Sequence, residues 1–167
     1  RGATFECMFS NSKFNGDISN WNTSRARDMA SMFSRSVFQG DISRWDVSNV
    51  QSMRAMFMSS QFNGDIADWD VSNVTQFQYM FDNSQFNCDI GAWNVEKAET
   101  MKGMFAESAF NRPLDQWKPL QCRVVQNMFA RSQFKQDISM WSLPIAVDTR
   151  EMFHHNVAGR RILKMTP

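Results

Sequence analysis

Residues 62–81 read FNGDIADWDVSNVTQFQYMF, and this stretch decides the fold because the chain repeats it. The same pattern stands at residues 38–57 as FQGDISRWDVSNVQSMRAMF and at residues 86–105 as FNCDIGAWNVEKAETMKGMF. All six tryptophans follow the same 24-residue period, from Trp21 to Trp141. A period in the twenties is typical of arrays in which each unit buries its apolar face against its neighbours. The Asp-Trp-Asp run is therefore first a folding unit rather than a catalytic motif.

Each unit predicts one short strand and one short helix. Trp69 and Val71 alternate as the residues of a strand do. Residues 50–57 then place apolar side chains three and four positions apart, which is typical of one face of a helix. The Ser-Asn pair at 72–73 suits the start of a helix, because its side-chain oxygens can accept free amide hydrogens. We therefore expect an α/β fold with parallel strands stacked about 4.8 Å apart.

Composition and charge argue against several broad classes of function. The chain has 167 residues, with 18 basic and 17 acidic side chains and a net charge of +1, so the charge balance does not favour nucleic acid as a partner. Its apolar runs are far shorter than the ~20 residues that span a bilayer, so we expect no transmembrane segment. The three cysteines stand at different positions of the repeat, which favours free thiols over disulfides.

The repeat also resembles a known family. FNGDISNWNTS at 14–24, FQGDISRWDVSNVQSMRAMF at 38–57 and FNGDIADWDVSNV at 62–74 are similar to the repeat of BspA-like leucine-rich-repeat surface proteins, a mycoplasma-type domain of unknown function. The resemblance implies a right-handed leucine-rich-repeat-like solenoid of about six to seven repeats, used for binding. It implies a cell-surface or secreted location, with an organellar or intracellular assembly as the alternative. The family has no shared catalytic residues.

The repeat covers nearly the whole chain, so we expect a single domain over residues 1–167. Residues 1–13 form a partial first repeat, 14–157 hold six repeats, and 158–167 are a degenerate closing unit. The pattern weakens toward the C-terminus, where Pro119 and Pro144 replace constant positions. Such arrays usually need terminal caps, and the chain starts in mid-repeat, so we expect it to be part of a longer parent chain.

Side chains that could carry chemistry fall into repeat columns, which favours structural roles. We expect the Met and Trp columns to be core. A weak Ca²⁺ site near Asp46 and Asp70, and a Trp stripe that stacks on sugars, are alternatives that the sequence leaves open. Without a phosphate-binding glycine loop or metal-ligand spacing, we expect no cofactor, no metal and no enzymatic activity. An acidic column before each expected strand should cap turns through backbone amides; its members are Asp17, Asp41, Asp65, Asp89 and Asp137.

Variable positions remain for recognition, since the constant ones are committed to packing. The first candidate surface is the strand face, where the residues that flank each Trp vary: Asn20, Asn22, Arg44, Asp46, Asp68, Asp70, Asn94, Gln116 and Lys118. The second is a docking edge at the C-terminal repeats, where apolar residues appear at the strand-to-helix turn: Leu120, Val124, Pro144 and Ile145. The alternative is that other residues of the same chain cover this edge.

From these observations we expect a non-catalytic repeat module for protein–protein interaction or scaffolding, within a larger assembly. The partner would bind the strand face or the docking edge. The alternative is an extracellular adhesin segment that recognises glycan or host protein. Exposed tryptophans would favour the glycan, because flat aromatic rings stack on sugars.

Overall fold

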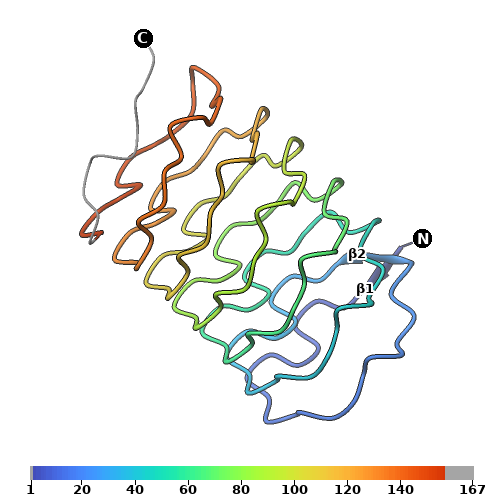
Figure 1. The fold of residues 1–167 in the computed structure, drawn as a ribbon. Coiled ribbons are helices and arrows are strands. Elements are labelled where there is room, and N and C mark those ends of the chain that lie inside the picture. The colour runs from blue at the N-terminus through green and yellow to red at the C-terminus, as the bar shows by residue number, and fades with distance from the viewer. Residues whose placement is uncertain (1, 157–167) are drawn as a thin grey trace.

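The structure is a computed structural model that describes residues 2–156, so the closing unit expected at 158–167 lies outside the described residues. The chain winds as a stack of similar coils, and the colour in Figure 1 runs in order from one end of the stack to the other. The first two coils pair through the parallel strands β1 (Ala3–Thr4) and β2 (Ala26–Asp28). Single parallel bridges, 24 residues apart, continue this line: Asp28–Ser52, Ser52–Gln76, Gln76–Thr100, Thr100–Val124 and Val124–Asp148.

The expected α/β leucine-rich-repeat-like solenoid is wrong. Residues 2–156 contain no helix and only the two short strands β1 and β2, so no repeat has both the strand and the helix that the pattern predicted. The expected strand around Trp69 and Val71 consists of turns and irregular backbone. The residue that bridges neighbouring coils is instead Gln76 or its counterpart, which lies in the segment assigned to the helix.

Hydrogen bonding between coils explains why residues 50–57 do not form a helix. Met53 N–H donates to Gln76 O at 3.0 Å and Ala55 N–H to Gln78 O at 2.9 Å, so alternate amides pair with the next coil. The amides between them close turns within the coil, as Met56 N–H does onto Met53 O at 3.1 Å. A helix would direct every amide four residues back along its own segment. When copies of one segment stack, the carbonyls of the next coil offer these amides a second set of acceptors. The spacing of apolar residues alone does not reveal such acceptors.

Left-handed backbone positions recur twice in each coil, four residues apart. Ala55 has a φ of 53° and Ser59 a φ of 55°, and the same pairing occurs in all the coils that the structure describes. A right-handed helix does not accommodate such residues, which cost roughly 1–2 kcal/mol each when they carry a Cβ. The pairing of their amides with the next coil offsets this cost. The positions are Cys7, Asn11, Ser31, Arg35, Ala55, Ser59, Tyr79, Asn83, Gly103, Glu107, Asn127, Arg131, Glu151 and His155.

The core consists of columns of like side chains, one from each coil. Phe57 stacks on Phe81 with ring centroids 5.8 Å apart, and Phe81 on Phe86 at 4.0 Å. Such aromatic pairs add to the free energy gained by burying the rings. The methionine beside each stack is buried from Met32 to Met152, so the predicted core role of this column is confirmed there.

The tryptophan column is also core, as predicted, except at the N-terminal coil. From Trp45 to Trp141 each indole is at most 9% exposed. Trp69 Nε1–H donates to Ile42 O in the preceding coil at 3.1 Å, and the other four buried tryptophans repeat this bond. Trp21, in the first coil, is 37% exposed. Five of the six rings are therefore held in place by both packing and a hydrogen bond.

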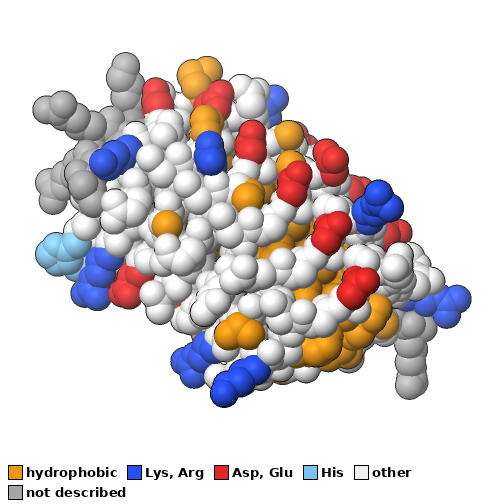
Figure 2. Space-filling view, turned by 60° about the horizontal axis from the view of Figure 1, so that its bottom comes forward, with side chains coloured by type: hydrophobic (Ala, Val, Ile, Leu, Met, Phe, Trp, Pro, Cys, Tyr) orange, Lys and Arg blue, Asp and Glu red, His pale blue; other side chains and the backbone are white. Residues whose placement is uncertain are grey.

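The acidic column caps turns, as predicted. Asp41 Oδ1 accepts Ser43 N–H at 2.9 Å, and this hydrogen bond lowers the pKa of Asp41. Figure 2 shows acidic side chains in a row along one face of the molecule. The amide two residues ahead is likewise bound by Asp17, Asp65, Asp89 and Asp137.

Candidate functional site

The candidate site is one edge of the stack, formed in each coil around the position of the repeat's Ser-Asn pair. We call it the Ser-Asn edge, and it comprises residues 24–27, 48–51, 72–75, 96–99, 120–123 and 144–147. Its backbone is tied from coil to coil, since Thr75 N–H donates to Gln51 O at 3.0 Å and Glu99 N–H to Thr75 O at 2.8 Å. Three hollows lie along this edge. The coil-to-coil bonds hold their lining residues at a fixed spacing.

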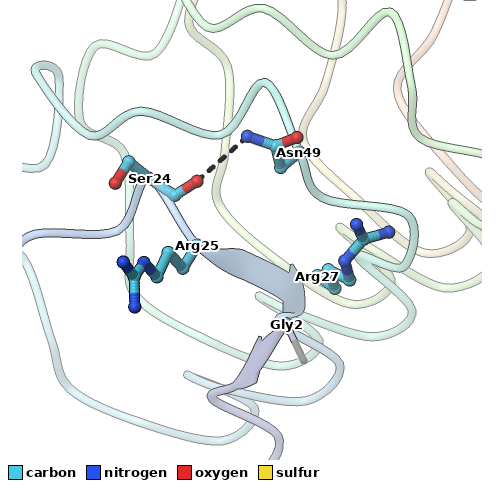
Figure 3. Close-up of a pocket in the computed structure, with 5 residues that line it drawn as sticks. All are labelled: Gly2, Ser24, Arg25, Arg27 and Asn49. Atoms are coloured by element: carbon cyan, nitrogen blue, oxygen red, sulfur yellow. Dashed lines mark hydrogen bonds between the residues drawn. The ribbon is translucent and has the colours of Figure 1, made fainter.

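The first hollow, at the N-terminal end, is basic and has a volume of about 470 Å³. It is lined by Gly2, Ser24, Arg25, Arg27 and Asn49 (Figure 3). The guanidinium groups of Arg25 and Arg27 point away from each other, while Asn49 Nδ2 donates to Ser24 O at 3.0 Å (Figure 3). The stem of Arg27 lies against Gly2, where an added Cβ would overlap it. Because no carboxylate lines this hollow, it suits an anionic group.

The second hollow continues the first, because the two share Arg27 and Asn49. Its volume is about 370 Å³. Lys97 Nζ donates to Asn73 Oδ1 at 2.6 Å on its far wall, so this cation is anchored by a neighbouring coil. Amides, a hydroxyl and two cations thus face the same space. The lining residues are Arg27, Asn49, Gln51, Asn73, Thr75 and Lys97.

The third hollow, at the C-terminal end, has an apolar part and a volume of about 430 Å³. Leu120 lines this hollow and is 49% exposed. Ile145 is fully exposed and directly follows Pro144, which also lines the hollow. Cys122, behind the wall of this hollow, is fully buried, and its burial raises the pKa of its thiol. The hollow therefore suits an apolar side chain. It is lined by Glu99, Leu120, Gln121, Cys122, Arg123, Pro144 and Ala146.

Within the part of the chain that the structure describes, the cations at the N-terminal half of the edge have no carboxylate partner. Arg25, Arg27 and Lys97 form no ion pair with any residue from 2 to 156. Guanidinium groups form strong, directional hydrogen bonds with carboxylates and phosphates. The basic half of the edge is thus open to an anionic group of another molecule. The ion pairs that the described residues do form are Glu6–Arg54, Glu107–Arg131 and Asp148–Arg150.

The residues predicted on the strand face lie on turns and irregular backbone instead. Asp70 Oδ1 accepts Ser72 N–H at 3.1 Å, and the hydroxyl and amide of Ser72 lower the pKa of Asp70. Three more of the predicted residues cap the amide two positions ahead, namely Asn22, Asp46 and Asn94. The other predicted residues are exposed: Asn20, Arg44, Asp68, Gln116 and Lys118. Part of this surface is thus engaged in local turns, and a role in recognition stays a prediction.

The docking edge predicted from the C-terminal repeats falls largely on the Ser-Asn edge. Leu120 and Pro144 line the third hollow, and Ile145 follows directly. Val124 does not line it, because it forms part of the line of bridges, between Thr100 and Asp148. The structure therefore brings together three of the four residues of the predicted edge.

Sequence reasoning missed the basic half of the edge. Arg25 stands where the next two coils carry Asn49 and Asn73, so a signal was available as a departure from the repeat. The segment was assigned to a helix start, where polar side chains are expected to satisfy backbone amides. With the segment assigned to a helix start, residues 24 positions apart were not expected to lie side by side along the stack.

No metal-ligand cluster occurs within the described residues. Residues 2–156 contain no group of three or more His, Cys, Asp or Glu side chains that could hold a metal ion. Asp46 Oδ1, near which Ca²⁺ was the alternative, accepts the amide and the hydroxyl of Ser48 at 3.0 and 2.6 Å. The same part of the chain has no helix with the length and apolarity that crossing a bilayer requires.

Comparison with known proteins identifies the repeat. A family profile described as "Mycoplasma protein of unknown function, DUF285" matches residues 3–85 and again residues 58–164. The chain belongs to this family. Membership confirms a mycoplasma-type repeat domain of unknown function, and it does not extend to the leucine-rich-repeat surface proteins that the repeat resembles. No curated protein and no solved structure matches the chain.

Proposed function

We propose that the chain is a non-catalytic interaction module that binds a protein segment along the Ser-Asn edge. The observation that carries the proposal is the alignment of three hollows on one edge, basic at one end and partly apolar at the other. With coils about 4.8 Å apart, six coils span about 24 Å, which fits an extended segment of about seven residues. Such a segment would place acidic side chains opposite Arg25 and Arg27 and an apolar one opposite Leu120.

Burial of the tryptophan column favours a protein over a glycan as the ligand. Rings that are at most 9% exposed, from Trp45 to Trp141, offer no stripe on which sugars could stack. An adhesin that recognises a host protein, as the BspA-like resemblance implies, would use the same edge and is the alternative form of this proposal. In both cases the bound segment would carry acidic side chains at one end and an apolar side chain at the other, to match the hollows.

Selection of peptides from a displayed random library, with the purified chain as bait, tests the proposal. We expect enriched peptides to carry acidic residues at one end and an apolar residue at the other. Arg25→Glu/Arg27→Glu should weaken binding of a selected peptide at least about tenfold, because it places like charges opposite the acidic end. Leu120→Asp should also weaken binding of the same peptide, because it places a charge opposite the peptide's apolar residue.

A matched control uses the other predicted surface. Arg44→Glu/Lys118→Glu reverses the same number of charges on exposed residues outside the Ser-Asn edge. This variant should retain full affinity for the selected peptides. If the control variant loses binding and the edge variants do not, the strand-face residues are the site and the edge proposal is wrong.

A further inference from the structure

A fourth hollow lies on another part of the stack, along the left-handed positions of the coils, and we call it the Tyr79 hollow. Its volume is about 290 Å³. It shares no lining residue with the three hollows of the Ser-Asn edge, so a ligand bound here leaves the side chains of that edge unoccupied. The lining residues are Tyr79, Gly103, Ala106, Glu107, Asn127, Ala130, Arg131, Glu151 and His154.

Small side chains in two successive coils leave the floor of this hollow open. Ala106 and Ala130 stand in a column of the repeat where the two preceding coils carry larger side chains. The space that a larger side chain would fill therefore stays empty above both coils. From residue 58 onward the column is Met58, Asp82, Ala106, Ala130 and His154.

The ring of the chain's single tyrosine forms one wall of the hollow. Gly103, one coil after Tyr79, has a φ of 59°, and a Cβ added to it would lie 2.6 Å from both Cδ1 and Cε1 of the tyrosine ring. Glycine thus lets the ring lie against the backbone of the next coil. This packing holds an aromatic ring beside the alanine floor, and aromatic rings attract cations to their faces.

Negative charge predominates around the Tyr79 hollow. Glu107 and Glu151 line it, and Arg131 is the only Lys or Arg among the lining residues. Arg131 Nη1 lies 3.2 Å from Glu107 Oε1, so this cation already has a partner. Glu151 forms no ion pair with any residue from 2 to 156. Asp82, in the column of Ala106, adds a carboxyl group whose pKa is raised to about 6 by burial and by the charge of Glu107.

We propose that the Tyr79 hollow binds the guanidinium group of an arginine side chain from another protein. The flat guanidinium packs against the Tyr79 ring, and the apolar stem of the arginine lies on Ala106 and Ala130. Glu107 accepts a guanidinium N–H through Oε2, because its Oε1 takes the hydrogen bond from Arg131. Arginine suits this site better than lysine, since an ammonium group has no flat face to stack on a ring. The proposal is independent of the peptide site on the Ser-Asn edge.

A titration followed by NMR tests the proposal on the 167-residue chain. Tyr79 is the only tyrosine, so isotope labelling of tyrosine gives ring signals from this residue alone. The probes are acetyl-Ala-Ala-Arg-Ala-Ala-amide and the same peptide with citrulline in place of arginine, both at pH 8. Citrulline keeps the shape of the side chain and lacks the charge. We expect the arginine peptide to shift the ring signals to saturation and the citrulline peptide to bind at least about tenfold more weakly.

Variants separate the hollow from a general effect of charge. Ala106→Met fills the hollow with the side chain that Met58 places in the same column, so the fold should persist while affinity for the arginine peptide falls at least about tenfold. Glu107→Gln should also weaken binding, whereas Arg131→Gln should strengthen it by releasing Glu107 for the guest. Glu96→Gln is the matched control, at an exposed residue that lines none of the four hollows, and should bind as the wild type does.

The sign of the change in Arg131→Gln distinguishes a cationic guest from an anionic one. Loss of binding in this variant would mean that Arg131 holds the guest, which overturns the proposal. Ring signals that do not respond to the arginine peptide, equal binding of the citrulline peptide, or unchanged binding by Ala106→Met each overturn it as well. If Ala106→Met does not fold, Glu107→Gln and Arg131→Gln decide, because both change charge at exposed side chains with little change in size.

Discussion

At the scale of the residue, hydrogen bonds between neighbouring coils hold individual side chains in place. Trp69 is 4% exposed, and its indole donates to Ile42 O at 3.1 Å. Trp69→Phe removes this bond and leaves a gap in the core, so we expect the free energy of unfolding to fall by about 2–4 kcal/mol. Trp21→Phe, at the exposed indole without a described acceptor, should cost less than about 1 kcal/mol. Urea unfolding of both variants measures the difference, and equal losses would contradict a role for the indole bond.

The carboxyl group of Asp82 makes the stability of the protein depend on pH. Burial, and then the charge of Glu107, raises the pKa of Asp82 to about 6, above the value of about 3.9 in an unfolded chain. The stabilising protonated form is therefore fully present below about pH 4 and is lost as the pH rises through about 6. Asp82→Asn should match the wild type in stability near pH 4 and exceed it by about 1 kcal/mol near pH 8, with solvent screening allowed for.

Chemical unfolding of wild type and Asp82→Asn over this pH range tests the prediction. Comparing the two proteins at each pH cancels the contributions of the other acidic groups. Asp68→Asn, which removes an exposed carboxylate, is the control for the loss of one surface charge. A flat difference for Asp82→Asn would contradict the assigned role of its carboxyl group.

At the scale of the element, the repeated turn with left-handed residues replaces the expected helix. Ser31 has a φ of 55°, and glycine adopts this conformation without strain, so Ser31→Gly should raise the free energy of unfolding by about 0.5 kcal/mol. Ser52, in the line of bridges, has no positive φ, so Ser52→Gly should lower it by about 0.5–1 kcal/mol. Thermal unfolding measures both variants. In a helix both substitutions would destabilise, so two losses would contradict the turn structure.

At the scale of the whole molecule, each coil depends on its neighbours, and among the described residues the first coil has a neighbour on one side only. Phe9 N–H and Phe81 N–H donate to carbonyls of the next coil at the same distance of 2.9 Å. In a stack of this kind opening begins at the ends. We expect the Phe9 amide to exchange with solvent at least about tenfold faster than the Phe81 amide. Hydrogen exchange followed by NMR measures both, and equal rates would indicate one all-or-none unfolding step.

The 24-residue period was sufficient to predict which side chains are core and which cap turns. Phe81 and Trp69 are buried and Asp41 binds Ser43 N–H because each coil repeats the same local chemistry, and local chemistry can be read along the chain. The sequence also singled out Leu120 and Pro144, which line the third hollow, since apolar residues at polar positions stand out in a repeat. A role for them in docking stays a prediction.

The backbone path and the basic half of the site were decided by the tertiary structure alone. Apolar residues three positions apart fit a helix and a run of turns equally, and the choice depends on whether Met53 N–H finds its acceptor in its own segment or in Gln76 of the next coil. Likewise Arg25 and Asn49 line one hollow only because stacking places residues 24 positions apart side by side. Apolar burial follows from composition and period, whereas a hydrogen bond needs a partner in space, and only the stacked coils supply it.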